Sequence, residues 1–162
     1  MVVDSKLLQI YVADHRAMSA GVTQRLAQMA EYTHLSFVGE IDLMHHEFIA
    51  EQAWLETLAR RHGVAGGTVK RSAAQLGEIL GRFKLNGRLR SKSPLSPLIE
   101  IEMLIAAIAV KITFFQTLAA VPGLTEDSEQ VSELLDQAHQ QFEHATKWHR
   151  ALRREAFTSR HV

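Results

Sequence analysis

Residues 103–110, Met-Leu-Ile-Ala-Ala-Ile-Ala-Val, are apolar on every side of a helix. A helix without a polar face is either surrounded by other helices or inserted in a membrane. Lys111 lies near the middle of an apolar run that extends to Val121, where an ammonium group would cost about 3 kcal/mol on insertion into a bilayer. We therefore expect this helix to be the central member of a helical bundle and not a transmembrane segment.

Three further segments carry the apolar stripes that such a bundle needs. Their apolar residues recur three or four positions apart, which is the period of a helix with one buried face. The predicted helices cover residues 5–33, 37–63, 97–121 and 126–157, and the last three follow the expected N-caps Ser36, Ser96 and Thr125. Short turns join the first helix to the second and the third to the fourth, so each pair is predicted to form an antiparallel hairpin.

About thirty residues separate the two hairpins. They begin with the helix-breaking pair Gly66-Gly67 and contain a short predicted helix over residues 68–84. A long crossover between two hairpins is how ferritin-like bundles are connected. We predict an all-α protein with a ferritin-like four-helix bundle of two antiparallel hairpins, joined by a long crossover that contains a short extra helix. The length of 162 residues suits one domain over residues 1–162.

The composition excludes several kinds of chemistry. The chain has no cysteine, which excludes disulfides, thiolate zinc sites, iron–sulfur clusters and cysteine nucleophiles, and fits a reducing compartment. The first six residues lack the basic segment and apolar core of a secretory signal, so we predict a cytoplasmic protein. Gly-rich phosphate loops and nucleophile motifs are also missing. Nothing in the sequence therefore supports catalysis.

Histidines and carboxylates are predicted to reach the bundle interior from all four helices. His15 and His149 replace apolar residues in the stripes of the first and last helices, and Glu47 and Glu51 stack on one face of the second. Counting residues along both helices from the loop that joins them places Glu51 within two helical turns of His15. These residues are either hydrogen-bonded core residues or ligands of one metal ion. The candidate ligands are His15, Glu47, Glu51, Glu100, Glu102 and His149.

The third helix carries two glutamates and Lys111. Eleven residues bring a helix almost back to its starting azimuth, so Glu100 and Lys111 share a face, and Glu102 lies nearly opposite. Carboxylates in a first turn also interact favourably with the helix dipole. A buried ammonium needs a carboxylate partner or a route to water. The sequence therefore predicts a buried ion pair between Glu100 and Lys111, or a common cluster that both reach.

The candidate ligands do not match the ligand pattern of the metal centres found in helical bundles. A diiron or dimanganese site uses a Glu from each of two helices and Glu-x-x-His from the other two, but the only such motif here, Glu31 to His34, lies at a helix end. The third helix contains no histidine, which departs from hemerythrin-like proteins. Asp42-x-x-His45 and Asp136-x-x-His139 lie beside the apolar stripes. A single Fe, Mn or Zn ion is what the interior could hold, and Lys111 favours an ion-pair network instead.

Charge is segregated along a chain whose net charge is zero. Residues 60–92 are strongly basic, and residues 113–146 contain acids but no Lys or Arg. The basic side chains either meet an anion such as a phosphate or dock against the acidic last helix. Interleaved aromatics and a recognition-helix pattern are missing, so there is no strong nucleic-acid signal. The basic residues of the crossover are Arg82, Lys84, Arg88, Arg90 and Lys92.

Several segments together resemble a known family. They are Asp14-His15, Glu47 with Glu51, Arg-Phe-Lys-Leu-Asn-Gly-Arg-Leu over residues 82–89, Ser-Pro-Leu-Ser-Pro-Leu-Ile-Glu-Ile-Glu over residues 93–102, and Lys111. The chain resembles a group of uncharacterised bacterial ferritin-like bundle proteins over most of its length. This resemblance implies the fold and a bacterial cytosolic setting, but no particular activity. His149 and the double histidine His45-His46 are not part of the pattern.

Two hypotheses about function follow from the sequence. In the first, the chain is a ferritin-like bundle whose interior carboxylate, histidine and lysine cluster is structural or binds a single metal ion or small ligand. In the second, it is a homodimeric interaction protein without a ligand site, and its interior polar residues set the register of the helices.

Overall fold

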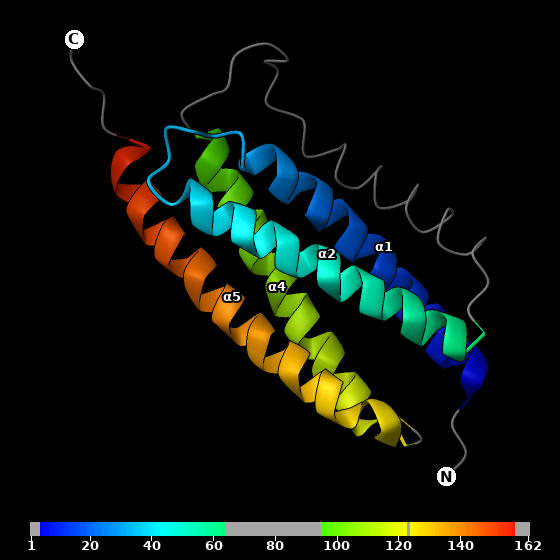
Figure 1. The fold of residues 1–162 in the computed structure, drawn as a ribbon. Coiled ribbons are helices and arrows are strands. Elements are labelled where there is room, and N and C mark those ends of the chain that lie inside the picture. The colour runs from blue at the N-terminus through cyan, green and yellow to red at the C-terminus, as the bar shows by residue number, and fades with distance from the viewer. Residues whose placement is uncertain (1–3, 64–94, 123, 158–162) are drawn as a thin grey trace.

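A computed structural model describes residues 4–63, 95–122 and 124–157. It contains four long helices, α1 (Ser5–Met29), α2 (Val38–Arg61), α4 (Ser96–Ala120) and α5 (Ser128–Glu155), with a short 3-10 helix, η1 (Thr125–Asp127), before α5 (Figure 1). No strand occurs in the described residues, which confirms the all-α class. The predicted helix over residues 68–84 and the five basic crossover residues lie outside the described residues.

Side-chain contacts give the direction of each helix. His15 stacks on Phe114, and Tyr32 bonds to Glu100, so α1 and α4 are antiparallel. Trp148 at one end of α5 bonds to Glu40, and the α2 end residue Arg61 bonds to Asp127. Helices α2 and α5 are therefore antiparallel as well, and α2 and α4 run in the same direction (Figure 1). The end of α2 and the start of α4 consequently lie at opposite ends of the bundle.

The buried positions of three helices are spaced alternately three and four residues apart. In α2 they run from Ile41 to Leu58, in α4 from Ile101 to Leu118, and in α5 from Val131 to Leu152. A seven-residue repeat of this kind is typical of helices that pack with a left-handed twist, and we call these positions the heptad seam. No helix among the described residues is both long enough and apolar enough to cross a membrane.

The buried seam of α5 differs from the stripe predicted from its sequence. Leu135 and Phe142 continue the three- and four-residue apolar spacing in which His149 was predicted, but the core side chains are their preceding neighbours Leu134, Gln141 and Trp148. Each step of one residue turns a helix by about 100°. The structure thus brings a glutamine into the core and leaves His149 half-buried at its edge.

The helix ends also differ in part from the predictions. Asp4 caps α1, because its carboxylate accepts hydrogen bonds from the backbone of Lys6 and Leu7 at 2.9 and 3.2 Å. Ser36 was the wrong cap for α2: Phe37 is the N-cap, and its ring stacks on Trp148 with centroids 5.4 Å apart. Apolar packing therefore fixes the start of α2 instead of a side-chain hydrogen bond.

The predicted caps of the last two helices are corrected in the same way. Leu95 is the N-cap of α4, and Ser96 is already its first helical residue. Thr125 begins η1, and Asp127 is the N-cap of α5. Helix α1 ends at Met29, before the predicted end at Thr33, because the backbone turns over residues 30–37.

Candidate functional site

A layer of polar side chains crosses the middle of the bundle. Each helix contributes one residue to it: Ser19 from α1, Glu51 from α2, Lys111 from α4 and Gln141 from α5, with relative exposures of 7%, 2%, 7% and 1%. Two separate apolar clusters fill the core on either side of this layer. On each of the four long helices, the residues on one side of the polar residue along the chain pack in one apolar cluster, and the residues on the other side pack in the second. We call these four residues the polar layer.

Lys111 is the centre of the polar layer. Its Nζ donates hydrogen bonds to Glu51 Oε2 at 2.7 Å and to Gln141 Oε1 at 2.5 Å. The same nitrogen lies 3.5 Å from the centroid of the Phe48 ring, which is a cation–π contact. An ammonium group has three N–H donors and no acceptor. A carboxylate, an amide oxygen and an aromatic face thus surround this cation.

Gln141 extends the network towards the surface of the bundle. Its amide Nε2 donates to Glu47 Oε2 at 2.7 Å, and Glu47 is half-buried, one turn before Glu51 on α2. The amide therefore accepts from the cation with its oxygen and donates to the second carboxylate with its nitrogen. Glu47 and Glu51, predicted to stack on one face, both reach this network.

Burial is the main influence on the ionisation of the central pair. Loss of solvent raises the pKa of the Glu51 carboxyl, and the nearby Lys111 ammonium opposes this rise. Loss of solvent lowers the pKa of Lys111, and Glu51 opposes that fall. Burial penalises the charged form of each group, so the pair is an ion pair whose desolvation is only partly compensated by its own attraction.

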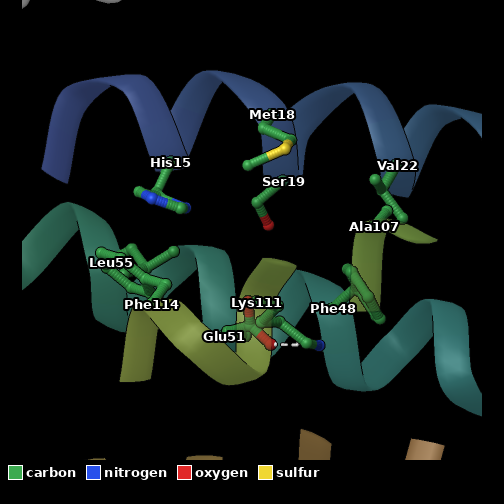
Figure 2. A pocket seen from close by; sticks show the side chains of 10 residues that line it. All are labelled: His15, Met18, Ser19, Val22, Phe48, Glu51, Leu55, Ala107, Lys111 and Phe114. Atoms are coloured by element: carbon green, nitrogen blue, oxygen red, sulfur yellow. Dashed lines mark hydrogen bonds and ion pairs between the residues drawn. The ribbon is translucent and has the colours of Figure 1, made fainter. Parts of the chain in front are cut away.

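A small cavity adjoins the polar layer between α1, α2 and α4 (Figure 2). Its volume is about 20 Å³, which is enough for one water molecule. The hydroxyl oxygen of Ser19 is buried and makes no hydrogen bond with the described residues. Figure 2 shows this oxygen pointing from α1 towards Glu51 and Lys111. Because buried polar atoms are rarely left without a partner, the cavity is suited to a bridging water.

His15 lines the same cavity as Glu51, so the structure brings together the two residues that counting along the helices placed within reach. The His15 ring stacks on Phe114 with centroids 4.3 Å apart and meets the Tyr11 ring edge-on at 4.6 Å. Burial lowers the pKa of His15, and Asp14 opposes this shift. At pH 7 the imidazole is therefore neutral and packs as an aromatic ring.

Glu100 does not pair with Lys111 as the sequence predicted. Its Oε1 accepts from the Tyr32 hydroxyl at 3.0 Å and from Arg25 Nη1 at 3.3 Å. Eleven residues return to one azimuth, but they also rise by about 16 Å along the helix, so two side chains at that spacing do not meet. We call Arg25, Tyr32 and Glu100 the end cluster.

The remaining predicted ligands lie in a third place. His149 Nε2 is 3.3 Å from Glu102 Oε1, and their side chains are 28% and 52% exposed. The six candidate metal ligands are thus divided: His15, Glu47 and Glu51 lie near Lys111, Glu100 belongs to the end cluster, and Glu102 and His149 meet at the surface. The structure does not gather them around one point.

Four residues of these clusters were missed in the sequence: Ser19, Arg25, Tyr32 and Gln141. Gln141 was missed because the adjacent apolar Phe142 fitted the predicted stripe. The available signal was the strict seven-residue spacing through Leu134, Gln141 and Trp148. Arg25 and Tyr32 carried no such signal, because only the packing of α1 against α4 brings them to Glu100.

No family model, curated protein or solved structure matches this chain.

Proposed function

We propose that the chain is a ferritin-like helical bundle in which the Lys111 ammonium takes the central position that a metal ion holds in metal-binding bundles. One observation carries this proposal: Lys111 Nζ lies 2.7 Å from Glu51 and 2.5 Å from Gln141, which in turn bonds to Glu47. A metal ion bound by Glu51 would have to displace this ammonium. The interior polar layer is then structural, and the protein acts through its surface.

The position of the polar layer supports a role in setting the helix register. If one helix slid by a heptad, its polar residue would enter an apolar cluster and leave its partners without hydrogen bonds. A buried group without a partner costs about 1–3 kcal/mol, and more when it is charged. Single polar residues fix register in coiled coils by the same penalty. The layer thus favours one alignment of the four helices over its shifted alternatives.

Metal analysis of protein purified without an affinity tag tests this proposal. The variant Glu51→Gln keeps the size of the side chain but removes its negative charge. His15→Phe keeps a flat aromatic ring but removes both ring nitrogens, so each variant weakens or removes a metal ligand. We expect the Fe, Mn and Zn content per chain to be the same in both variants and in the wild type. One ion per chain that is lost in both variants would support the interior metal site instead, and would overturn the structural role.

The outer face of α4 supports a second candidate function, the homodimeric interaction protein. Apart from the buried Lys111, α4 has no charged residue after Glu102. Its exposed positions there include Ala106, Val110, Thr113 and Thr117, although exposed helix faces normally carry charged and polar groups. An uncharged face can pair with its own copy across a two-fold axis without leaving a buried charge unpaired.

Light scattering over a range of protein concentrations tests the second candidate. Val110 is 40% exposed, and we expect a dimer that Val110→Glu converts to a monomer, because a carboxylate would be buried against its symmetry mate. Gln140→Glu places the same charge on an exposed position of α5 and serves as the control. A wild-type monomer at all concentrations would contradict the homodimer. The bacterial cytosolic setting stays a prediction from the sequence.

A further inference from the structure

Three side chains that metal ions favour lie on the outer surface of α2. Asp42, His45 and His46 each offer one ligand atom, and these atoms lie within 4.8 Å of one another. Spacings of three and four residues place Asp42 beside both histidines on one helix face. Asp42 and His46 are exposed, and His45 is half-buried. We call these residues the surface triad.

One hydrogen bond fixes the chemical form of His46. Its Nδ1 lies 2.8 Å from the backbone oxygen of Asp42. A carbonyl oxygen only accepts hydrogen bonds, so in the neutral ring Nδ1 holds the proton and Nε2 carries the free lone pair. Metal-binding histidines commonly donate one ring N–H to a backbone carbonyl in this way, which orients the other nitrogen towards the ion. In this tautomer Nε2 is the nitrogen that can bind an ion, and Nδ1, which carries the proton, lies 3.9 Å from Asp42 Oδ2.

We propose that the surface triad binds a divalent zinc-class ion through two imidazoles and one carboxylate. Zn²⁺ binds this mixture of nitrogen and oxygen ligands, whereas Mg²⁺ and Ca²⁺ prefer oxygen alone. Three protein ligands leave the fourth tetrahedral position for water or for a group on a partner. The site is separate from the polar layer and does not depend on the proposed function.

The side chains of the surface triad are free to close around an ion. At usual zinc–ligand distances, ligand atoms in a tetrahedral site lie about 3.4 Å apart. The ligand atoms of the surface triad lie within 4.8 Å of one another, so no pair has to approach by more than about 1.4 Å. The side chains of His46 and Asp42 are 68% and 57% exposed. Within the described part of the chain, the ion pair recorded for these two residues is the one that they form with each other, between His46 Nδ1 and Asp42 Oδ2 at 3.9 Å. Rotation about exposed side-chain bonds supplies the movement.

Helix α5 offers a matched comparison. Asp136 and His139 are both exposed and repeat the spacing of Asp42 and His45, but residue 140 is glutamine where α2 has a second histidine. This pair therefore has two ligands where the surface triad has three. His139→Ala removes one exposed histidine without touching the proposed site.

Zinc titration of the full chain by calorimetry, without an affinity tag, tests the proposal. We expect one Zn²⁺ per chain, and a Co²⁺-loaded protein with the intense visible absorption of a tetrahedral site. His45→Ala and His46→Ala should each weaken Zn²⁺ binding by about tenfold or more. Loss of a residue that only hydrogen-bonds to a ligand already costs about tenfold, and loss of a ligand should cost at least as much. His139→Ala and Glu51→Gln should leave the affinity unchanged.

Two results would overturn the surface site. One is a titration that does not saturate at one ion per chain. The other is binding of one ion per chain that is unchanged in both His45→Ala and His46→Ala. If that binding is lost in Glu51→Gln, the ion lies in the interior of the bundle instead. Circular dichroism of each variant, including the buried Glu51→Gln, checks that the helices are intact. The substitutions at the surface residues His46 and His139 should not disturb them.

Discussion

The polar layer and the end cluster contain the same kind of interaction in different surroundings. In each, a carboxylate meets a cation from another helix, and a third side chain bonds to one member of the pair. Gln141 accepts from Lys111 in the polar layer, and Tyr32 donates to Glu100 in the end cluster. The side chains of Lys111 and Glu51 are 8% and 2% exposed, whereas those of Arg25 and Glu100 are 40% and 14% exposed. The comparison predicts that burial, and not the chemistry of the pair, decides what each pair contributes to stability.

The contribution of a buried ion pair to stability requires both of its members. Water can solvate a surface charge that loses its partner, so exposed pairs contribute about 0–1 kcal/mol. A charge left alone in the core has no such substitute, although replacing both members by apolar groups is often neutral. We therefore expect substitutions in the polar layer to have large and strongly non-additive effects, and those in the end cluster to have small ones.

The largest effect is predicted for Lys111→Met, which keeps the length of the side chain but removes the ammonium. Glu51 then stays in the core without its counter-charge. The free energy of unfolding should fall by about 3–5 kcal/mol at neutral pH, as measured by chemical denaturation. The double variant Lys111→Met with Glu51→Leu should recover most of this loss, because only the Gln141 carbonyl is left without its donor. Equal losses in the single and double variants would contradict the coupling.

The pH dependence of Lys111→Met sharpens the same test. The pKa of Glu51 is already raised from its usual 4.5 by burial, and loss of the ammonium raises it further. A raised pKa in the folded state means that the carboxyl contributes stability below pH 4.5, and that this contribution is lost as the pH rises through the folded pKa. The difference in unfolding free energy between wild type and Lys111→Met should therefore narrow on acidification from neutral pH towards 4.5.

A smaller effect is predicted for Tyr32→Phe in the end cluster. The substitution removes the hydroxyl that donates to Glu100 at 3.0 Å, and Arg25 remains beside the carboxylate. We expect a loss of about 1 kcal/mol in the free energy of unfolding. A loss as large as that of Lys111→Met would show that exposure does not separate the two clusters.

Titration of the Tyr32 hydroxyl offers a second measurement on the end cluster. Burial, followed by the charge and hydrogen bond of Glu100, raises the pKa of Tyr32 to about 12. Its stabilising contribution is complete below pH 10, the usual pKa of tyrosine, and is lost as the pH rises through the folded-state pKa of about 12. Glu100→Gln removes the negative charge, so the ultraviolet titration of Tyr32 should shift towards lower pH, and Glu102→Gln should leave it in place.

The sequence predicted the helices more fully than it predicted their contacts. The apolar run beginning at Met103 and the short turns were enough for four helices and two hairpins, because these depend on local spacing. The partner of Lys111 was not predicted. The sequence indicates which face of α4 carries Lys111, but it does not indicate which residue of another helix lies at the same level along the bundle axis. Glu51 meets Lys111 only because α2 and α4 run in the same direction, and that depends on how residues far apart in sequence are connected.

The smallest effect is predicted for His149→Ala, at the residue that the sequence placed in the core. Trp148 fills the core position and donates to Glu40 at 2.9 Å, whereas His149 meets the exposed Glu102 at 3.3 Å. A solvated pair of this kind contributes little, so denaturation should show a change within about 0.5 kcal/mol. Trp148→Phe, one residue away, is the control and should cost clearly more, because it leaves unfilled space in the core. If His149→Ala destabilised the protein more than Trp148→Phe did, the stripe predicted from the sequence would describe α5 better than the heptad seam does.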